Sequence, residues 1–68
     1  MSNAIRVVLK DQEVRYFRTD GANKWYTCHV EGDGCLTVYL EWDGGVCNGR
    51  NPVASFAQGV WVEWGEKT

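Results

Sequence analysis

The chain has few of the residues that enzymes use for covalent or acid–base chemistry. It contains one histidine, His29, and Ser55 is the only serine after the first four residues. His29 follows Cys28 directly, but consecutive strand residues point to opposite faces, so the two are poorly placed for a thiol–imidazole pair. Phosphate-binding, calcium-binding and dinucleotide-binding motifs are also missing. We therefore expect no enzymatic activity and no cofactor.

Cysteines are few, odd in number and widely spaced. Six residues separate Cys28 from Cys35, and eleven separate Cys35 from Cys47, whereas structural zinc sites usually use ligand pairs two to four residues apart. The sequence shows no signal-peptide pattern and no apolar run long enough to span a membrane. We expect reduced thiols in a cytoplasmic protein without bound metal, with a Cys35–Cys47 disulfide as the alternative.

The excess of charge is small and unevenly distributed. The net charge of −2 argues against a protein that binds nucleic acid mainly by neutralising phosphates. Residues 1–30 carry five basic and three acidic side chains, whereas residues 31–68 carry two basic and six acidic ones. The length is that of a single domain with a small core. We assign residues 1–4 to an expression scar or disordered N-terminus, 5–65 to one β domain and 66–68 to a C-terminal tail.

Short runs of alternating apolar and polar residues take the place of long hydrophobic segments and predict strands. The strands are expected over 4–10, 13–19, 24–31, 35–42 and 60–64. A two-residue turn on Asp11-Gln12 would pair Leu9 with Val14 and Val7 with Tyr16. A three-residue loop on Gly32-Asp33-Gly34, with Gly34 left-handed, would pair Val30 with Leu36, Cys28 with Val38 and Tyr26 with Leu40.

Asp43-Gly44-Gly45 and Asn48-Gly49 are predicted to be turns around a short Val46-Cys47 segment. The only proline follows, in a segment that reads as one or two helical turns. Asn51 can cap a helix, Pro52 suits its first position, and Gly59 lies just past its end. In the closing strand, Val60, Val62 and Trp64 are expected to point inward, and Trp61 and Glu63 outward. This order of elements is that of a small five-stranded Src-homology-3-like barrel. An open curved sheet with one short helical turn before the last strand is the alternative.

Four tryptophans stand out in so short a chain, and alternation separates them into two pairs. Trp42 and Trp64 are expected in the core, and Trp25 and Trp61 on the surface. The outer side of the central hairpin would present Trp25, Thr27 and His29 opposite Glu41, Tyr39 and Thr37, with Val8 and Phe17 as possible extensions. Such a patch usually marks a contact site, unless the helix or a long turn covers it as a second small core.

These observations favour a small non-enzymatic protein-binding domain of the adaptor or inhibitor type, such as a viral or mobile-element accessory protein. The predicted contact residues are Trp25, His29, Tyr39, Glu41 and Trp61, because tryptophan and tyrosine often dominate protein interfaces. One alternative is a homo-oligomeric structural protein that self-associates through this face. Another is a barrel that stacks single-stranded nucleic acid on the aromatic residues.

Overall fold

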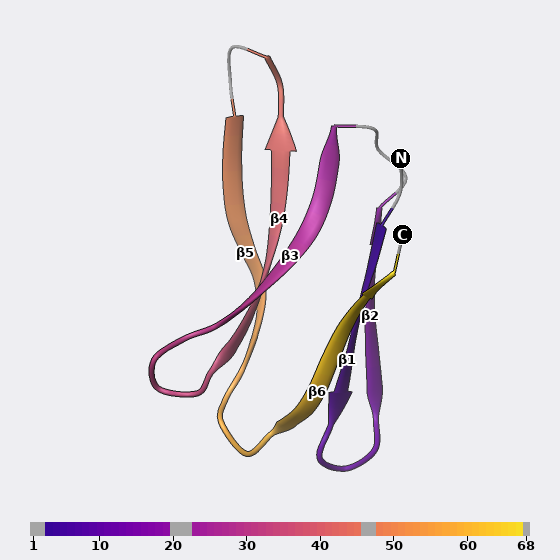
Figure 1. Cartoon of the computed structure of the whole chain (residues 1–68), viewed down its shortest axis with the longest axis vertical. Helices are drawn as coiled ribbons and strands as arrows, with labels where there is room; N and C mark the ends of the chain where they lie inside the picture. The colour runs from indigo at the N-terminus through magenta and orange to yellow at the C-terminus, as the bar shows by residue number, and fades with distance from the viewer. Residues whose placement is uncertain (1–2, 20–22, 46–47, 68) are drawn as a thin grey trace.

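The computed structural model describes residues 3–19, 23–45 and 48–67, and these form six strands and no helix (Figure 1). The strands are β1 (Asn3–Leu9), β2 (Val14–Thr19), β3 (Lys24–Val30), β4 (Leu36–Asp43), β5 (Asn48–Phe56) and β6 (Trp61–Lys67). They pair as two antiparallel sheets, in the orders β2-β1-β6 and β3-β4-β5. The all-β prediction is confirmed, but the described strands form two separate sheets rather than a closed five-stranded barrel.

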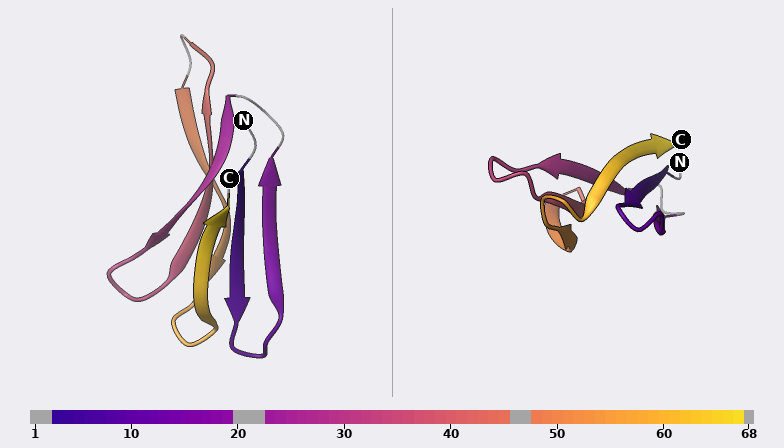
Figure 2. Two further views of the ribbon diagram at one scale, coloured as in Figure 1. Left: turned by 45° about the vertical axis from the view of Figure 1, so that its right-hand side comes forward. Right: turned by 90° about the horizontal axis from the view of Figure 1, so that it is seen from below.

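The two sheets result from an up-and-down path that is interrupted twice. Consecutive strands pair except at β2/β3 and at β5/β6, and β6 returns to pair with β1. The sheets pack with their strands crossing, as the two views in Figure 2 show. The Cα trace is long and thin, 39 × 23 × 13 Å. Each sheet therefore has one side facing its neighbour and one side facing outward.

The β1–β2 and β3–β4 hairpins have the same loop geometry. In the second, Gly34 has a φ of 86° and Glu31 N–H donates to Cys35 O at 2.8 Å, which confirms the predicted three-residue loop. In the first, Leu9 N–H donates to Glu13 O at 2.8 Å, and Gln12 takes the left-handed position with a φ of 73°. The predicted two-residue turn on Asp11-Gln12 was therefore wrong.

That extra loop residue changes which side chains of β2 face the core. Val8 pairs with Val14, and Ile5 pairs with Phe17. Phe17 consequently packs against the core, and Tyr16 is 65% exposed. We had expected Tyr16 inside and Phe17 outside, and both assignments were wrong because a one-residue shift reverses every side chain of a strand.

The central hairpin has the register that its loop predicts. Val30 pairs with Leu36, Cys28 with Val38, and Tyr26 with Leu40. This places the side chains of Leu36 and Val38 between the sheets, where both are fully buried. The five buried apolar residues of the core are Ile5, Val7, Leu9, Leu36 and Val38.

The segment predicted as a helical turn is part of β5. Pro52 lies opposite Tyr39 and Ala54 opposite Val38, so Val53 is an extra residue that forms a β-bulge. A proline without an N–H is tolerated because β5 is an edge strand and the ladder is already irregular there. The helix prediction was wrong, and the predicted Asn48-Gly49 turn also lies in β5. The predicted Val46-Cys47 segment lies outside the described residues.

A second bulge reverses part of the alternation predicted for the last strand. Leu9 pairs with Trp61 and Val8 with Glu63, so Val62 is the extra residue. Trp61 packs against the core, contrary to the prediction that it faces outward, and Val62 is 58% exposed although it was expected inside. Trp64 pairs with the buried Val7, on the core side as expected, but it remains 38% exposed because β6 is an edge strand.

Candidate functional site

The outer face of the β3-β4-β5 sheet gathers four of the five predicted contact residues. Trp25 pairs with Glu41, and His29 pairs with Thr37 next to Tyr39. Cross-strand partners share a face of the sheet, so these side chains lie on the side opposite the buried Leu36 and Val38. We call this surface the outer face; its residues are Trp25, Thr27, His29, Thr37, Tyr39, Glu41, Arg50, Pro52 and Ser55.

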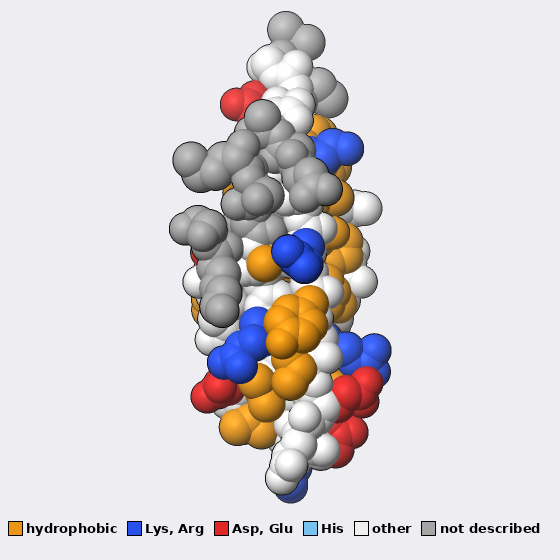
Figure 3. Space-filling model, turned by 90° about the vertical axis from the view of Figure 1, so that its right-hand side faces the viewer, with side chains coloured by type: hydrophobic (Ala, Val, Ile, Leu, Met, Phe, Trp, Pro, Cys, Tyr) orange, Lys and Arg blue, Asp and Glu red, His pale blue; other side chains and the backbone are white. Residues whose placement is uncertain are grey.

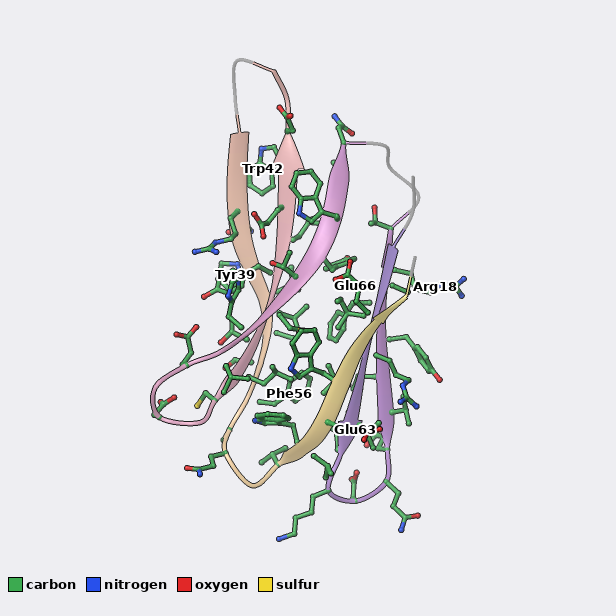
Figure 4. The ribbon with its side chains drawn as sticks, viewed as in Figure 1. Arg18, Tyr39, Trp42, Phe56, Glu63 and Glu66 are labelled. Carbon is green, nitrogen blue, oxygen red and sulfur yellow. The ribbon has the colours of Figure 1, made fainter. Side chains whose placement is uncertain are left out.

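Tyr39 is the centre of an ordered cluster on the outer face (Figure 4). The Arg50 guanidinium carbon lies 4.5 Å from the centroid of the Tyr39 ring, a cation–π arrangement. The His29 ring meets the same ring edge-on, with centroids 5.4 Å apart and planes at 73°. Arg50 Nη1 also lies 3.4 Å from His29 Nε2. Three residues from three strands thus fix one another in place.

Two glutamates accept hydrogen bonds around this cluster. Thr27 Oγ1 donates to Glu41 Oε2 at 2.6 Å, and Tyr39 Oη donates to Glu31 Oε1 at 3.4 Å. Thr27 and Glu41 are partly buried, whereas Glu31 is exposed. The carboxylates therefore hold hydroxyl groups of the face in defined positions and leave acceptor capacity toward solvent.

A shallow, open hollow of about 420 Å³ continues the outer face at one end of the sheet. Its lining residues are Trp25, Glu41, Trp42, Asp43, Gly49 and Arg50. Trp25 is 36% exposed beside it. Trp42 follows Glu41 in β4, so it does not share the face of Trp25 and Glu41. Its indole ring lies against Gly49, where a Cβ atom would overlap the ring. The hollow combines an exposed indole with groups of both charges.

Trp61 does not join this surface. Its indole Nε1 donates to Gly34 O at 2.9 Å, and its ring packs against the core between the sheets. Val8 pairs with Val14 and Glu63 on the other sheet, and Phe17 faces the core, so neither extends the outer face. The expected five-residue contact set is thus reduced to Trp25, His29, Tyr39 and Glu41.

Arg50 is the residue that sequence reasoning missed. It lies between a predicted turn and a predicted helix, where no strand alternation assigns it to a face. Its pairing with Glu41 becomes visible only once β5 is recognised as a strand. No apolar–polar alternation around Arg50 indicated a strand, and Pro52 favoured the helix interpretation.

Cys28 lies away from the outer face, Cys35 adjoins the β3–β4 loop opposite Glu31, and Cys47 lies outside the described residues. Cys28 packs against the core, opposite in direction to its neighbour His29. Burial raises the pKa of the Cys28 thiol from 9.0 to about 11, and the negative charge of Glu66 adds to the rise. Cys28 and Cys35 are both free thiols, and Cys47 is not among the described residues. A buried thiol with a raised pKa is a poor nucleophile at neutral pH.

Within residues 3–19, 23–45 and 48–67, no three His, Cys, Asp or Glu side chains are grouped closely enough to hold a metal ion. In the same ranges, no helix is long and apolar enough to cross a membrane. Comparisons with protein-family models, with curated proteins and with solved structures gave no match. Any inference about function therefore rests on the arrangement of the described side chains.

Proposed function

We propose that the chain is a non-enzymatic protein-binding domain, of the adaptor or inhibitor type, that docks through the outer face. The observation that carries this proposal is the Tyr39–Arg50–His29 cluster, which is ordered within the chain although no described element covers it. Aromatic and arginine side chains are the types that most often dominate the energy of protein interfaces.

Order within the cluster supports binding rather than a purely structural role. Side chains that already contact one another have less conformational entropy to lose when a partner covers them. Trp25 adds a large indole surface next to the hollow, and Glu41 holds Thr27 at 2.6 Å. The face thus offers an aromatic centre with an arginine stacked on it and polar groups beside it, and aromatic residues and arginine are enriched in protein interfaces.

The same observations argue against the nucleic-acid alternative. Glu31 and Glu41 lie beside the aromatic residues, and Glu31 accepts a hydrogen bond from Tyr39 itself. Their carboxylates would repel a phosphate backbone that runs along the stacked bases. Arg50 is the one cation paired within the Tyr39 cluster.

Affinity capture with matched variants tests the proposal. The immobilised wild-type chain is compared with Trp25→Ala and Arg50→Ala, and with Tyr16→Ala as the control, because Tyr16 is the more exposed aromatic residue but lies on the other sheet. Proteins retained from the source cell are identified by mass spectrometry. We expect one partner to bind at least about tenfold more weakly to both outer-face variants, since a hot-spot truncation costs 2 kcal/mol or more.

Equal retention by all four chains would contradict the proposal. Circular dichroism must show the same β-sheet signal for each variant, because loss of the fold would also abolish binding. Salt-sensitive binding of a labelled oligothymidylate that is lost in Trp25→Ala would instead support the nucleic-acid alternative.

A further inference from the structure

Two open sheets leave four strand edges, and three of them are protected against pairing with another chain. The edge strand β2 carries Arg15 and Arg18 in exposed positions, and Figure 3 shows basic side chains distributed over that side of the molecule. The edge strand β5 has Pro52 and a bulge at Val53. The edge strand β3 packs against β1 and β2. Charges, proline, bulges and coverage are the usual devices that prevent edge-to-edge association.

The fourth edge, β6, has a bulge at Val62 and carries Glu63, Glu66 and Lys67, so it is open to pairing only in a register that places no like charges opposite each other. It pairs with β1 on one side only, and after the bulge at Val62 the strand runs regularly through Glu63, Trp64 and Gly65. Val62 is 58% and Trp64 is 38% exposed there. The charge of Glu63 is compensated within the chain, because Arg6 Nη2 lies 3.1 Å from Glu63 Oε1.

We propose that β6 pairs with β6 of a second copy of this chain, antiparallel about a two-fold axis at Trp64. The β2-β1-β6 sheets of the two copies then join into one six-stranded sheet. In this register Trp64 meets Trp64 of the partner subunit on the core side of the sheet. Glu63 lies opposite Gly65 of the partner subunit, and Val62 lies opposite Glu66 of the partner subunit, so no like charges face each other directly.

A second copy suits this edge better than an unrelated strand for two reasons. A two-fold contact uses the single open edge of each copy, so the assembly closes as a dimer while the other edges stay protected. The chain also exposes 4677 Å², and a folded monomer of 7.7 kDa is expected to expose roughly 4,300 Å². The exposed area is thus close to that of an ordinary folded monomer, but the core has only five buried residues among the described strands, and so small a core gains from burying one more edge.

Mass measurement with two matched lysine variants tests the dimer. Val62→Lys places a charge on the proposed contact, and Val53→Lys places one on the protected β5 edge; both valines are largely exposed, at 58% and 44%. Light scattering on a sizing column is recorded over a range of protein concentrations. We expect twice the chain mass of 7.7 kDa for the wild type and for Val53→Lys, and a single chain mass for Val62→Lys.

Backbone amide exchange of the wild type provides a second measurement that needs no variant. Exchange of β6 amides should slow as concentration rises, while exchange of β2 amides should stay constant. A wild type of single mass at every concentration overturns the proposal, and so do equal masses for the two lysine variants. Dissociation by Trp25→Ala but not by Val62→Lys also overturns it, since self-association would then use the outer face. The β6 contact is on the other sheet, so its failure leaves the proposed function untouched.

Discussion

Gln12 adopts a backbone conformation that glycine tolerates better. Its φ of 73° lies in the left-handed region, where a residue with a Cβ loses about 1–2 kcal/mol. Glycine avoids that strain but loses about 0.5–1 kcal/mol through its freedom in the unfolded chain. We predict that Gln12→Gly raises the free energy of unfolding by up to about 1 kcal/mol, as measured by urea denaturation.

The equivalent loop supplies the control for this prediction. Gly34 occupies the same position with a φ of 86°, and a Cβ there would also press on the side chain of Gln58. Gly34→Ala should therefore lower the free energy of unfolding. A stabilising effect of Gly34→Ala, or a destabilising effect of Gln12→Gly, would show that the two loops are not equivalent.

The contrast between these loops explains why the register of one hairpin could be predicted from the sequence and that of the other could not. Gly34 marks the left-handed position of its loop, so the register of β3 and β4, and with it the direction of Trp25, His29, Tyr39 and Glu41, was predictable. Gln12 occupies the same left-handed position, but a glutamine does not indicate that conformation in the sequence. Both loops have an aspartate at their second position. Asp11 and Asp33 each accept a hydrogen bond from the backbone N–H two residues later, at 2.9 and 3.0 Å, so the aspartate was the feature of the sequence that indicated the same loop at both places.

At the scale of elements, Trp61 joins β6 to the loop of the β3–β4 hairpin. The indole Nε1 donates to Gly34 O at 2.9 Å while the ring packs on the core. Trp61→Ala removes both contacts and should lower the free energy of unfolding by about 3 kcal/mol. Trp61→Phe retains most of the apolar contact and should lose about 1 kcal/mol for the hydrogen bond.

Trp25→Ala is the matched comparison, since Trp25 lies on the outer face and is 36% exposed. Its effect on urea denaturation should be clearly smaller than that of Trp61→Ala. Equal losses for the two variants would mean that Trp25 also supports the fold, and the binding role proposed for the outer face would lose its main residue.

Two β-bulges account for part of the errors at this scale. The bulges at Val53 and Val62 each add a residue to a strand, and each changes which side chains face the core afterwards. A bulge depends on the partner strand, which comes from a distant part of the sequence, so local alternation does not reveal it. This is why Trp61 was placed on the wrong side, whereas Arg50 was overlooked because Pro52 favoured a helix in that segment.

At the scale of the whole molecule, local pattern predicted an all-β fold but not its division into two sheets. Hairpin pairs such as β3–β4 follow from neighbouring residues and a loop. The pairing of β1 with β6 joins the two ends of the chain, and the gaps at β2/β3 and β5/β6 depend on how the sheets twist and pack. The resulting thin molecule has only five buried apolar residues within its described strands.

Such a small core makes the stability of the molecule sensitive to association through β6. If two chains unfold from one dimer, a tenfold rise in protein concentration stabilises the dimer by about 1.4 kcal/mol, or about 0.7 kcal/mol per chain. For a domain of this size, that corresponds to a rise in Tm of about 3 to 5 °C. We predict this increase for the wild type and for Val53→Lys in thermal scans at several concentrations. Val62→Lys should unfold at a lower Tm that does not change with concentration, because each chain then unfolds alone. A wild-type Tm that is independent of concentration would mean that the fold is stabilised within the single chain alone and that association through β6 contributes nothing.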